Sequence, residues 1–180
     1  MCAALKTRTL VAHPTERLPV ISTFIVDNYA LTRIALGVAL VVAIVVALNL
    51  VRQGRIGRRI ATGLAIAGGV AILALTLAPD ARSVDGVMAC NFTVYSIAGD
   101  TFNMALFLLP AIFVVVATRR PLIVAAAVPL LSALIELVQF LSPVLGRRCD
   151  VDDLIANVVG GLIGVAIGAL VLRLRLPIRA

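Results

Sequence analysis

Long apolar runs alternate with short polar segments along most of this chain. A helix that crosses the hydrocarbon core of a bilayer needs about 17 to 25 predominantly apolar residues. Runs of that length predict five membrane-spanning helices, over Leu31–Val51, Ile60–Ala78, Thr101–Ala117, Leu122–Ser142 and Leu154–Leu172. The expected fold class is therefore all-α, a bundle of five transmembrane helices.

A shorter apolar segment, LPVISTFIVDNYA at residues 18–30, precedes the first predicted span. It is too short to cross once Asp27 and Asn28 are counted, so it is either an interfacial helix or an extension of the first span. We expect no cleavable signal, because the first long apolar run lies too far into the chain and is too long. The chain then divides into an N-terminal tail (1–30), spans one and two (31–78), a region holding spans three to five (79–172) and a basic tail (173–180).

Composition agrees with a membrane location. Hydrophobic residues make up 62% of the 180 residues and the mean hydropathy is +1.12, whereas a soluble domain is nearer ~45–50% apolar. Lys and Arg number 16 against nine acids. Arginines beside apolar runs of this length are explained by membrane topology, so no nucleic-acid partner is expected.

The basic residues divide unevenly between the two sides that five spans define. The side with the C-terminus carries nine basic residues and no acid: Arg52, Arg55, Arg58, Arg59, Arg119, Arg120, Arg173, Arg175 and Arg179. The opposite side carries seven basic residues and eight of the nine acids, the ninth being Glu136 inside span four. Since the orientation rule counts Lys and Arg near the spans, we expect the N-terminus outside and the C-terminus in the cytoplasm.

Two cysteines, Cys90 and Cys149, fall in loops on the predicted external side. An external face is oxidising, which makes them candidates for a disulfide. The alternative is two unrelated free thiols, since spacing alone does not test the geometry that a bridge needs.

Polar side chains recur at helical spacing near the predicted external ends of three spans. Steps of three and four place Ser132, Glu136 and Gln139 on one face of span four. Spans three and five have similar stripes, and the loop between spans four and five adds two arginines. We expect one polar pocket, open to the outside and lined by spans three, four and five. Its candidate residues are Asp100, Asn103, Glu136, Gln139, Arg147, Arg148, Asp150, Asp153 and Asn157.

Several of these residues have a purely structural alternative. Glu136 is either neutral and hydrogen-bonded to Gln139 or Asn103, or ionised beside Arg147 or Arg148 and able to bind an incoming group. The aspartates at 150, 152 and 153 either complement the positive N-terminal end of span five or contact a ligand, and Asp152, off the shared stripe, is expected to be solvated. Small residues in membrane helices allow close packing, a role expected of Gly160, Gly164 and Gly168.

Three motifs in order resemble the VanZ-like family of bacterial membrane proteins. They are Asp100-Thr-Phe-Asn103-Met-Ala-Leu-Phe107-Leu-Leu-Pro110, the Ser-x-x-x-Glu-x-x-Gln pattern of Ser132–Gln139, and Arg148-Cys-Asp150-Val-Asp152-Asp153-Leu-Ile-Ala-Asn157-Val-Val-Gly160-Gly161. Ala111 and Ile112 stand where the family often has glycine, a departure that concerns local helix geometry. The family is named for a member associated with teicoplanin resistance. The resemblance implies a protein of the bacterial cytoplasmic membrane that acts at its outer face, on or near cell-envelope material, through the same pocket residues.

Three classes of function fit these features unequally. The leading hypothesis is a binding role in which Arg147 and Arg148 meet an anionic group of an envelope lipid precursor or a glycopeptide. The alternative is a membrane enzyme acting on a lipid or cell-wall precursor, with Glu136 or Asp150 as general base. A transporter is less favoured, because polar groups crowd only one leaflet. The aspartates could hold Mg²⁺ or Ca²⁺, but they are as easily a helix start, and we expect no metal and no cofactor.

Overall fold

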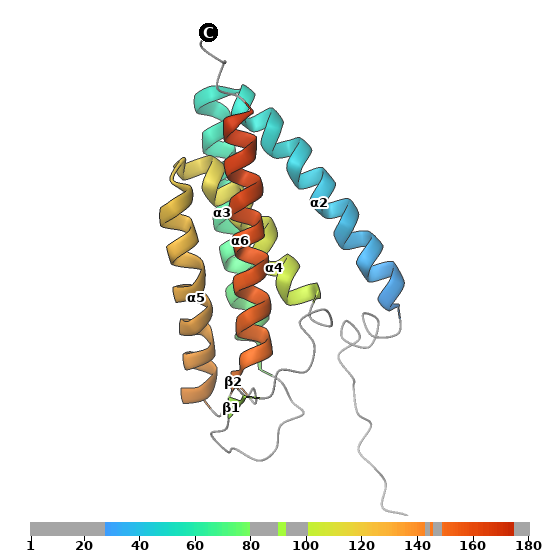
Figure 1. Ribbon diagram of the computed structural model, residues 1–180, viewed down its shortest axis with the longest axis vertical. Helices are drawn as coiled ribbons and strands as arrows, with labels where there is room; N and C mark the ends of the chain where they lie inside the picture. Colours follow the sequence, from blue (N-terminus) through green and yellow to red (C-terminus); the bar gives the residue numbers. More distant parts are fainter. Residues whose placement is uncertain (1–27, 80–89, 93–100, 143–144, 146–148, 175–180) are drawn as a thin grey trace, which may run out of the picture. The chain divides into compact units, whose positions relative to one another are not determined.

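The computed structural model describes residues 28–79, 90–92, 101–142, 145 and 149–174. Within these residues, five helices are long and apolar enough to cross a membrane, which confirms the all-α class. They are α2 (Tyr29–Arg52), α3 (Gly54–Thr76), α4 (Thr101–Thr118), α5 (Pro121–Leu141) and α6 (Val151–Arg173). Two short strands, β1 (Cys90–Asn91) and β2 (Cys149–Asp150), complete the elements shown in Figure 1.

The chain divides into two compact units, residues 1–34 and residues 35–180. In the first unit the structure describes only residues 28–34, which contain the start of α2. Of the segment predicted as an interfacial helix or an extension of the first span, residues 18–27 lie outside the described residues. Everything that follows concerns the second unit.

The ends of the helices differ most from prediction where charge adjoins an apolar run. Helix α3 begins at Gly54 rather than at Ile60, and α6 begins at Val151 rather than at Leu154. A search for apolar runs stops at the first charged residue, but arginine is a good helix former. The backbone of α3 therefore continues through its three arginines toward Gly54.

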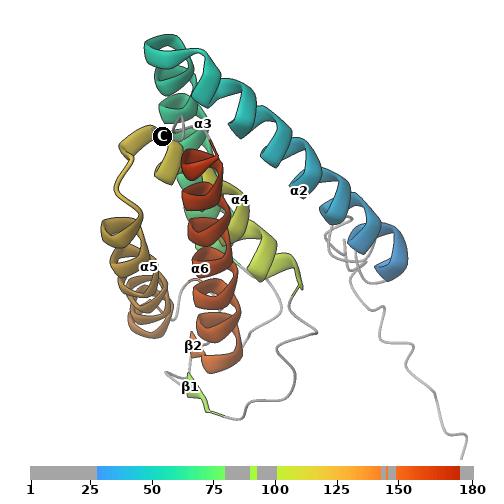
Figure 2. The same ribbon diagram turned by 45° about the horizontal axis from the view of Figure 1, so that its top comes forward.

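Helix α4 lies at the centre of the second unit and contacts α3, α5 and α6 (Figures 1 and 2). Its buried residues enter both hydrophobic clusters. Ile112 and Val116 pack with Ala47 of α2, whereas Phe107 and Val115 belong to the cluster that also holds residues of α3, α5 and α6. The bundle therefore depends on α4 for packing on every side.

Glycines let α6 approach the backbone of α4 closely. A Cβ added at Gly160 would lie 2.1 Å from the carbonyl oxygen of Met104, and one added at Gly164 would lie 2.3 Å from that of Leu108. At Gly168 the nearest atom would be the Cβ of Val115, at 2.8 Å. No side chain fits at these distances, so the three glycines set the separation of the two helices.

Large apolar side chains cover much of the outer surface of the helices. Leu122 is 85% exposed, Leu130 72% and Val70 60%. Soluble monomers rarely expose apolar patches of this extent. Such a surface is stable in contact with lipid acyl chains, as the apolar runs predict.

Candidate binding site

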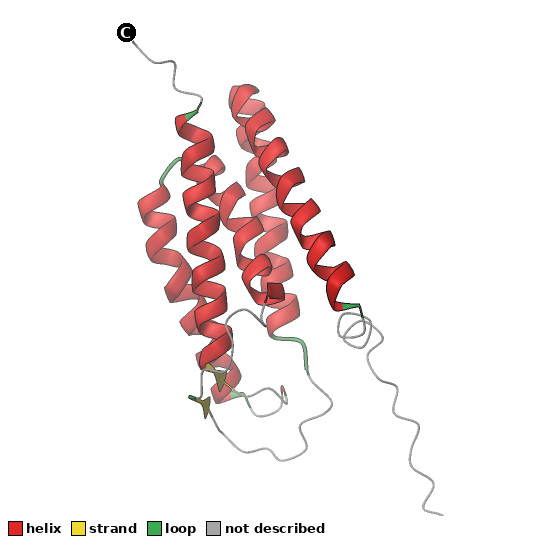
Figure 3. Ribbon diagram, turned by 45° about the vertical axis from the view of Figure 1, so that its right-hand side comes forward, coloured by secondary structure: helices red, strands yellow, loops and turns green. Residues whose placement is uncertain are grey.

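A disulfide joins Cys90 to Cys149, which confirms the first of the two alternatives for these thiols. The same residues are partners in a parallel strand pair, in which Cys90 lies opposite Cys149 and Asn91 opposite Asp150. Figure 3 shows this pair beside the N-terminal end of α6. The pair therefore fixes a segment that follows α3 against the start of α6.

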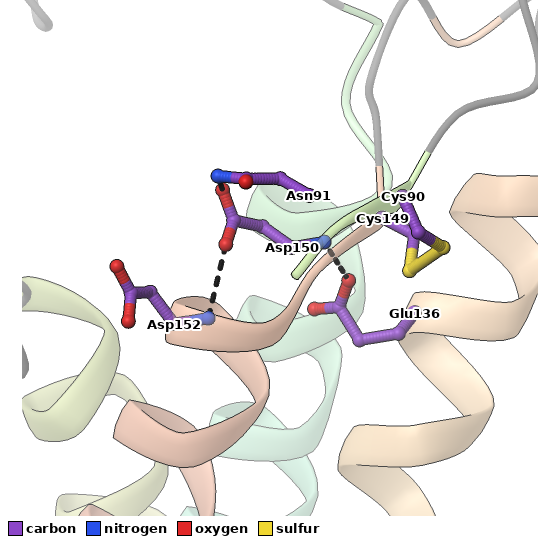
Figure 4. The surroundings of a disulfide bond; sticks show 6 residues. All are labelled: Cys90, Asn91, Glu136, Cys149, Asp150 and Asp152. Atoms are coloured by element: carbon purple, nitrogen blue, oxygen red, sulfur yellow. Dashed lines mark hydrogen bonds between the residues drawn. A yellow bond between two sulfur atoms is a disulfide. The ribbon is translucent and has the colours of Figure 1, made fainter. Parts of the chain in front are cut away.

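Asp150 caps the N-terminus of α6. Its Oδ1 accepts a hydrogen bond of 2.9 Å from the main-chain N–H of Asp152, and its Oδ2 accepts one of 3.2 Å from the side-chain amide of Asn91 (Figure 4). The first N–H groups of a helix have no partner within the helix, and an aspartate at this position supplies one. Of the two alternatives for the aspartates, the carboxylate of Asp150 therefore has the structural one, at the N-terminal end of the helix.

Glu136 connects α5 to the same residue. Its Oε2 accepts a hydrogen bond of 2.9 Å from the main-chain N–H of Asp150, and its side chain is only 5% exposed (Figure 4). A buried polar group inside a bilayer needs a partner to offset its desolvation. The bond to Asp150 supplies one and joins the C-terminal third of α5 to the start of α6.

Asn103 of α4 and Asp153 of α6 form a direct side-chain hydrogen bond, in which the amide of Asn103 donates to Oδ1 of Asp153. The two residues were expected on separate stripes facing one pocket, and the structure brings them into contact. Together with the bond between Glu136 and Asp150, this contact ties α4, α5 and α6 together at one end.

Gln139 has a contact that the sequence did not predict. Its side-chain amide donates a hydrogen bond of 2.7 Å to the carbonyl oxygen of Thr76, the last residue of α3. The last carbonyl groups of a helix lack partners within it. Gln139, which is only 4% exposed, therefore links α5 to the end of α3. No sequence signal pairs residues 63 positions apart, so this partner could not have been foreseen.

Asn157 lies one turn of α6 deeper than Asp153 and is 2% exposed. Its Oδ1 has no hydrogen-bond partner in the part of the chain that the structure describes. A buried acceptor without a partner costs roughly 1–3 kcal/mol. A donor placed within hydrogen-bonding distance of this oxygen would remove that cost.

The expectation that Asp152 is solvated is wrong. Its side chain is 8% exposed. With α6 beginning at Val151, Asp152 precedes the buried Ala156 by four residues, and Ala156 precedes Gly160 by four. Asp152 thus continues the face of small residues that packs on α4, a spacing that the sequence already contained.

Three predicted site residues, Asp100, Arg147 and Arg148, lie outside the described residues. The other six come from α4, α5, β2 and α6. Five of them, Asn103, Glu136, Asp150, Asp153 and Asn157, gather around the start of α6, whereas Gln139 contacts the end of α3. Among the described residues there is no group of three or more His, Cys, Asp or Glu side chains that could hold a metal ion.

Comparison with known proteins gives one family. A sequence model described as VanZ/LLP1 matches residues 38–172, from within α2 nearly to the end of α6. It therefore includes every candidate site residue and both cysteines of the disulfide. No curated protein and no solved structure gives a significant match.

Proposed function

The chain belongs to the VanZ/LLP1 family, and on that premise we propose that it binds the polar headgroup of an envelope lipid precursor. Binding occurs at the disulfide-linked end of the bundle, on the external face of a bacterial cytoplasmic membrane. The protein thereby contributes to glycopeptide resistance, including resistance to teicoplanin, or to envelope homeostasis. Asn157 and its neighbours around the start of α6 orient the headgroup, and Arg147 and Arg148 meet its anionic group.

The observation that carries this proposal is the buried Oδ1 of Asn157 without a partner among the described residues. Two aspartates nearer the start of α6 are already engaged: Asp153 accepts from Asn103, and Asp150 caps α6. A fully satisfied network would need nothing further. A buried acceptor next to side chains that are already hydrogen-bonded is the arrangement expected of a site whose ligand supplies the missing donor.

Two observations support the external location. Disulfides persist in oxidising compartments, and the bond between Cys90 and Cys149 stands at this end of the bundle. The opposite end carries Arg55, Arg58 and Arg59 with no acid beside them, as cytoplasmic ends do.

The test is Asn157→Leu, with Asn49→Leu as the matched control. Asn49 is also an asparagine in a span, but it is exposed on α2 and its amide donates to the carbonyl of Val45. We expect Asn157→Leu to lower affinity for a polyisoprenyl-diphosphate-linked cell-wall precursor by about tenfold, the value of one lost hydrogen bond. Affinity is measured on purified protein by native mass spectrometry, and the control should bind as the wild type does.

Stability distinguishes this role from a structural one. Replacing a buried polar group that lacks a partner by an apolar group of similar shape is neutral or stabilising, so Asn157→Leu should unfold at the same temperature as the wild type or higher. The same variant should fail to raise teicoplanin resistance in a sensitive bacterial host. A variant that loses stability but keeps its affinity for the precursor contradicts the proposal.

A further inference from the structure

A cavity of about 410 Å³ opens between α3 and α4, near the end of the bundle opposite the disulfide. This volume lies within the range of ~300–1,000 Å³ typical of small-molecule sites. Its lining includes Arg58, Thr62, Ala65 and Ile66 of α3 with Val114 and Thr118 of α4. The cavity has no residue in common with the site at the disulfide-linked end.

Arg58 stands at the polar end of this cavity and is held in place by one hydrogen bond. Its Nε donates to the carbonyl oxygen of Ala117 at 2.9 Å, near the end of α4. A guanidinium has five N–H donors, and the four others make no hydrogen bond or ion pair within the described residues. The side chain is exposed and lines the cavity, so these donors are accessible to a ligand there.

The charge around the cavity is of one sign. Arg55 and Arg59 flank Arg58 on α3, and Arg119 and Arg120 follow the end of α4, with no acid in residues 52–59 or 118–120. Clusters of arginine at the end of a membrane helix attract anionic lipid headgroups. Charge complementarity therefore favours an anionic occupant.

The inner part of the cavity is apolar. Ile66 lies eight residues after Arg58 on α3, about 12 Å further into the membrane at 1.5 Å per residue. Ala65 and Val114 line the same part, and Ile66 is 63% exposed, so this part opens toward the lipid phase. A cation at one end and an apolar groove below it match an amphiphile with an anionic head and a hydrocarbon tail.

We propose that this cavity is a binding site for an anionic phospholipid, with its phosphate on the guanidinium of Arg58 and one acyl chain in the groove along Ala65, Ile66 and Val114. In the orientation proposed above the lipid belongs to the cytoplasmic leaflet. The site is independent of the ligand site at the disulfide-linked end, so either proposal can fail without the other.

The experiment measures binding of phosphatidylglycerol and of phosphatidylcholine with the same acyl chains to the purified full-length protein, by native mass spectrometry. Wild-type protein should bind phosphatidylglycerol more tightly by at least about tenfold. Arg58→Gln should abolish this preference. Arg59→Gln is the matched control, because Arg59 is also exposed, adjacent in sequence and absent from the cavity lining, and it should retain most of the preference.

A second variant, Ala65→Phe, fills the apolar groove and leaves every charge in place. It should weaken phosphatidylglycerol binding while Arg58 stays bonded to Ala117. If Arg58→Gln does not fold, this variant still tests the proposal. Equal affinity for the two lipids, or equal losses in Arg58→Gln and Arg59→Gln, would overturn the proposal. Displacement of the lipid by inorganic phosphate alone would overturn it too, because the site would then be one for a free anion.

Discussion

At the scale of single residues, Asp150 has three separate partners. Its carboxylate accepts from Asp152 and Asn91, and its main-chain N–H donates to Glu136. These partners belong to α6, β1 and α5. One side chain and its own amide therefore connect a strand and two helices.

We expect Asp150→Ala to destabilise the protein by about 1–2 kcal/mol, the usual cost of losing an N-terminal helix cap. Asp150→Asn keeps a side-chain oxygen for Asp152 and should cost only a small part of that. The measurement is thermal unfolding of the purified protein in detergent, followed by circular dichroism. Equal unfolding temperatures for the wild type and Asp150→Ala would show that the cap contributes nothing.

The sequence predicted which polar residues lie near one another better than it predicted their contacts. Helical spacing and the family resemblance selected Asn103, Glu136 and Asp153, and all three lie in described contacts around the start of α6. The prediction for Asp152 was wrong, because Asp152 lies four residues before Ala156 and eight before Gly160, on the face of small residues that is buried. The sequence could not pair Gln139 with Thr76, since that contact depends on how α3 and α5 pack.

At the scale of elements, the close contact of α4 and α6 depends on glycines, which have no side chain to separate the two backbones. Gly160 and Gly164 each place the backbone of α6 against a carbonyl oxygen of α4, whereas Gly63 and Gly69 of α3 have no atom within 4 Å of an added Cβ. Glycines of the first kind fix a helix pair, and those of the second kind lie in open positions. The same residue type thus has two different consequences in neighbouring helices.

Gly160→Ala and Gly63→Ala form a matched pair of variants. Gly160→Ala forces α6 away from Met104 and should destabilise by about 1–3 kcal/mol, as other overpacked sites do. Gly63→Ala should be neutral or stabilising by up to about 1 kcal/mol, because alanine is the better helix former. Unfolding in a series of denaturing detergent mixtures measures both. Equal losses for the two variants would contradict the close packing of α6 on α4.

The helices themselves were predicted almost completely from apolar run length. The lipid phase imposes a minimum length on every span, so the signal is strong even in one sequence. The ends were less accurate where arginines extend α3 to Gly54. Strands β1 and β2 were not predicted, because two residues are too few to form any pattern of alternation.

At the scale of the whole molecule, the two ends of the bundle differ in chemistry. One end has a disulfide, Glu136 and three aspartates, and the other has arginines without acids. Membrane proteins keep basic residues in the cytoplasm and disulfides outside it. The two rules agree on one orientation.

The expected orientation places the C-terminus in the cytoplasm. A fluorescent protein fused after Ala180 should therefore fold and fluoresce in a bacterial host, whereas alkaline phosphatase fused there should be inactive. In the same cells, and with Cys2→Ser to remove the third cysteine, Cys90 and Cys149 should react with a maleimide only after reduction. An active phosphatase fusion would reverse the orientation, and labelling without reductant would show that the two thiols are not bonded.

The disulfide also orders events during synthesis. Cys90 and Cys149 are 59 residues apart, and both α4 and α5 lie in the stretch between them. In the proposed orientation, Cys149 reaches the oxidising side only after α4 and α5 have entered the membrane as a hairpin. Formation of the bond therefore marks the moment at which that hairpin is fully inserted. From then on, a protease cut between Thr118 and Pro121 would leave the two fragments covalently joined.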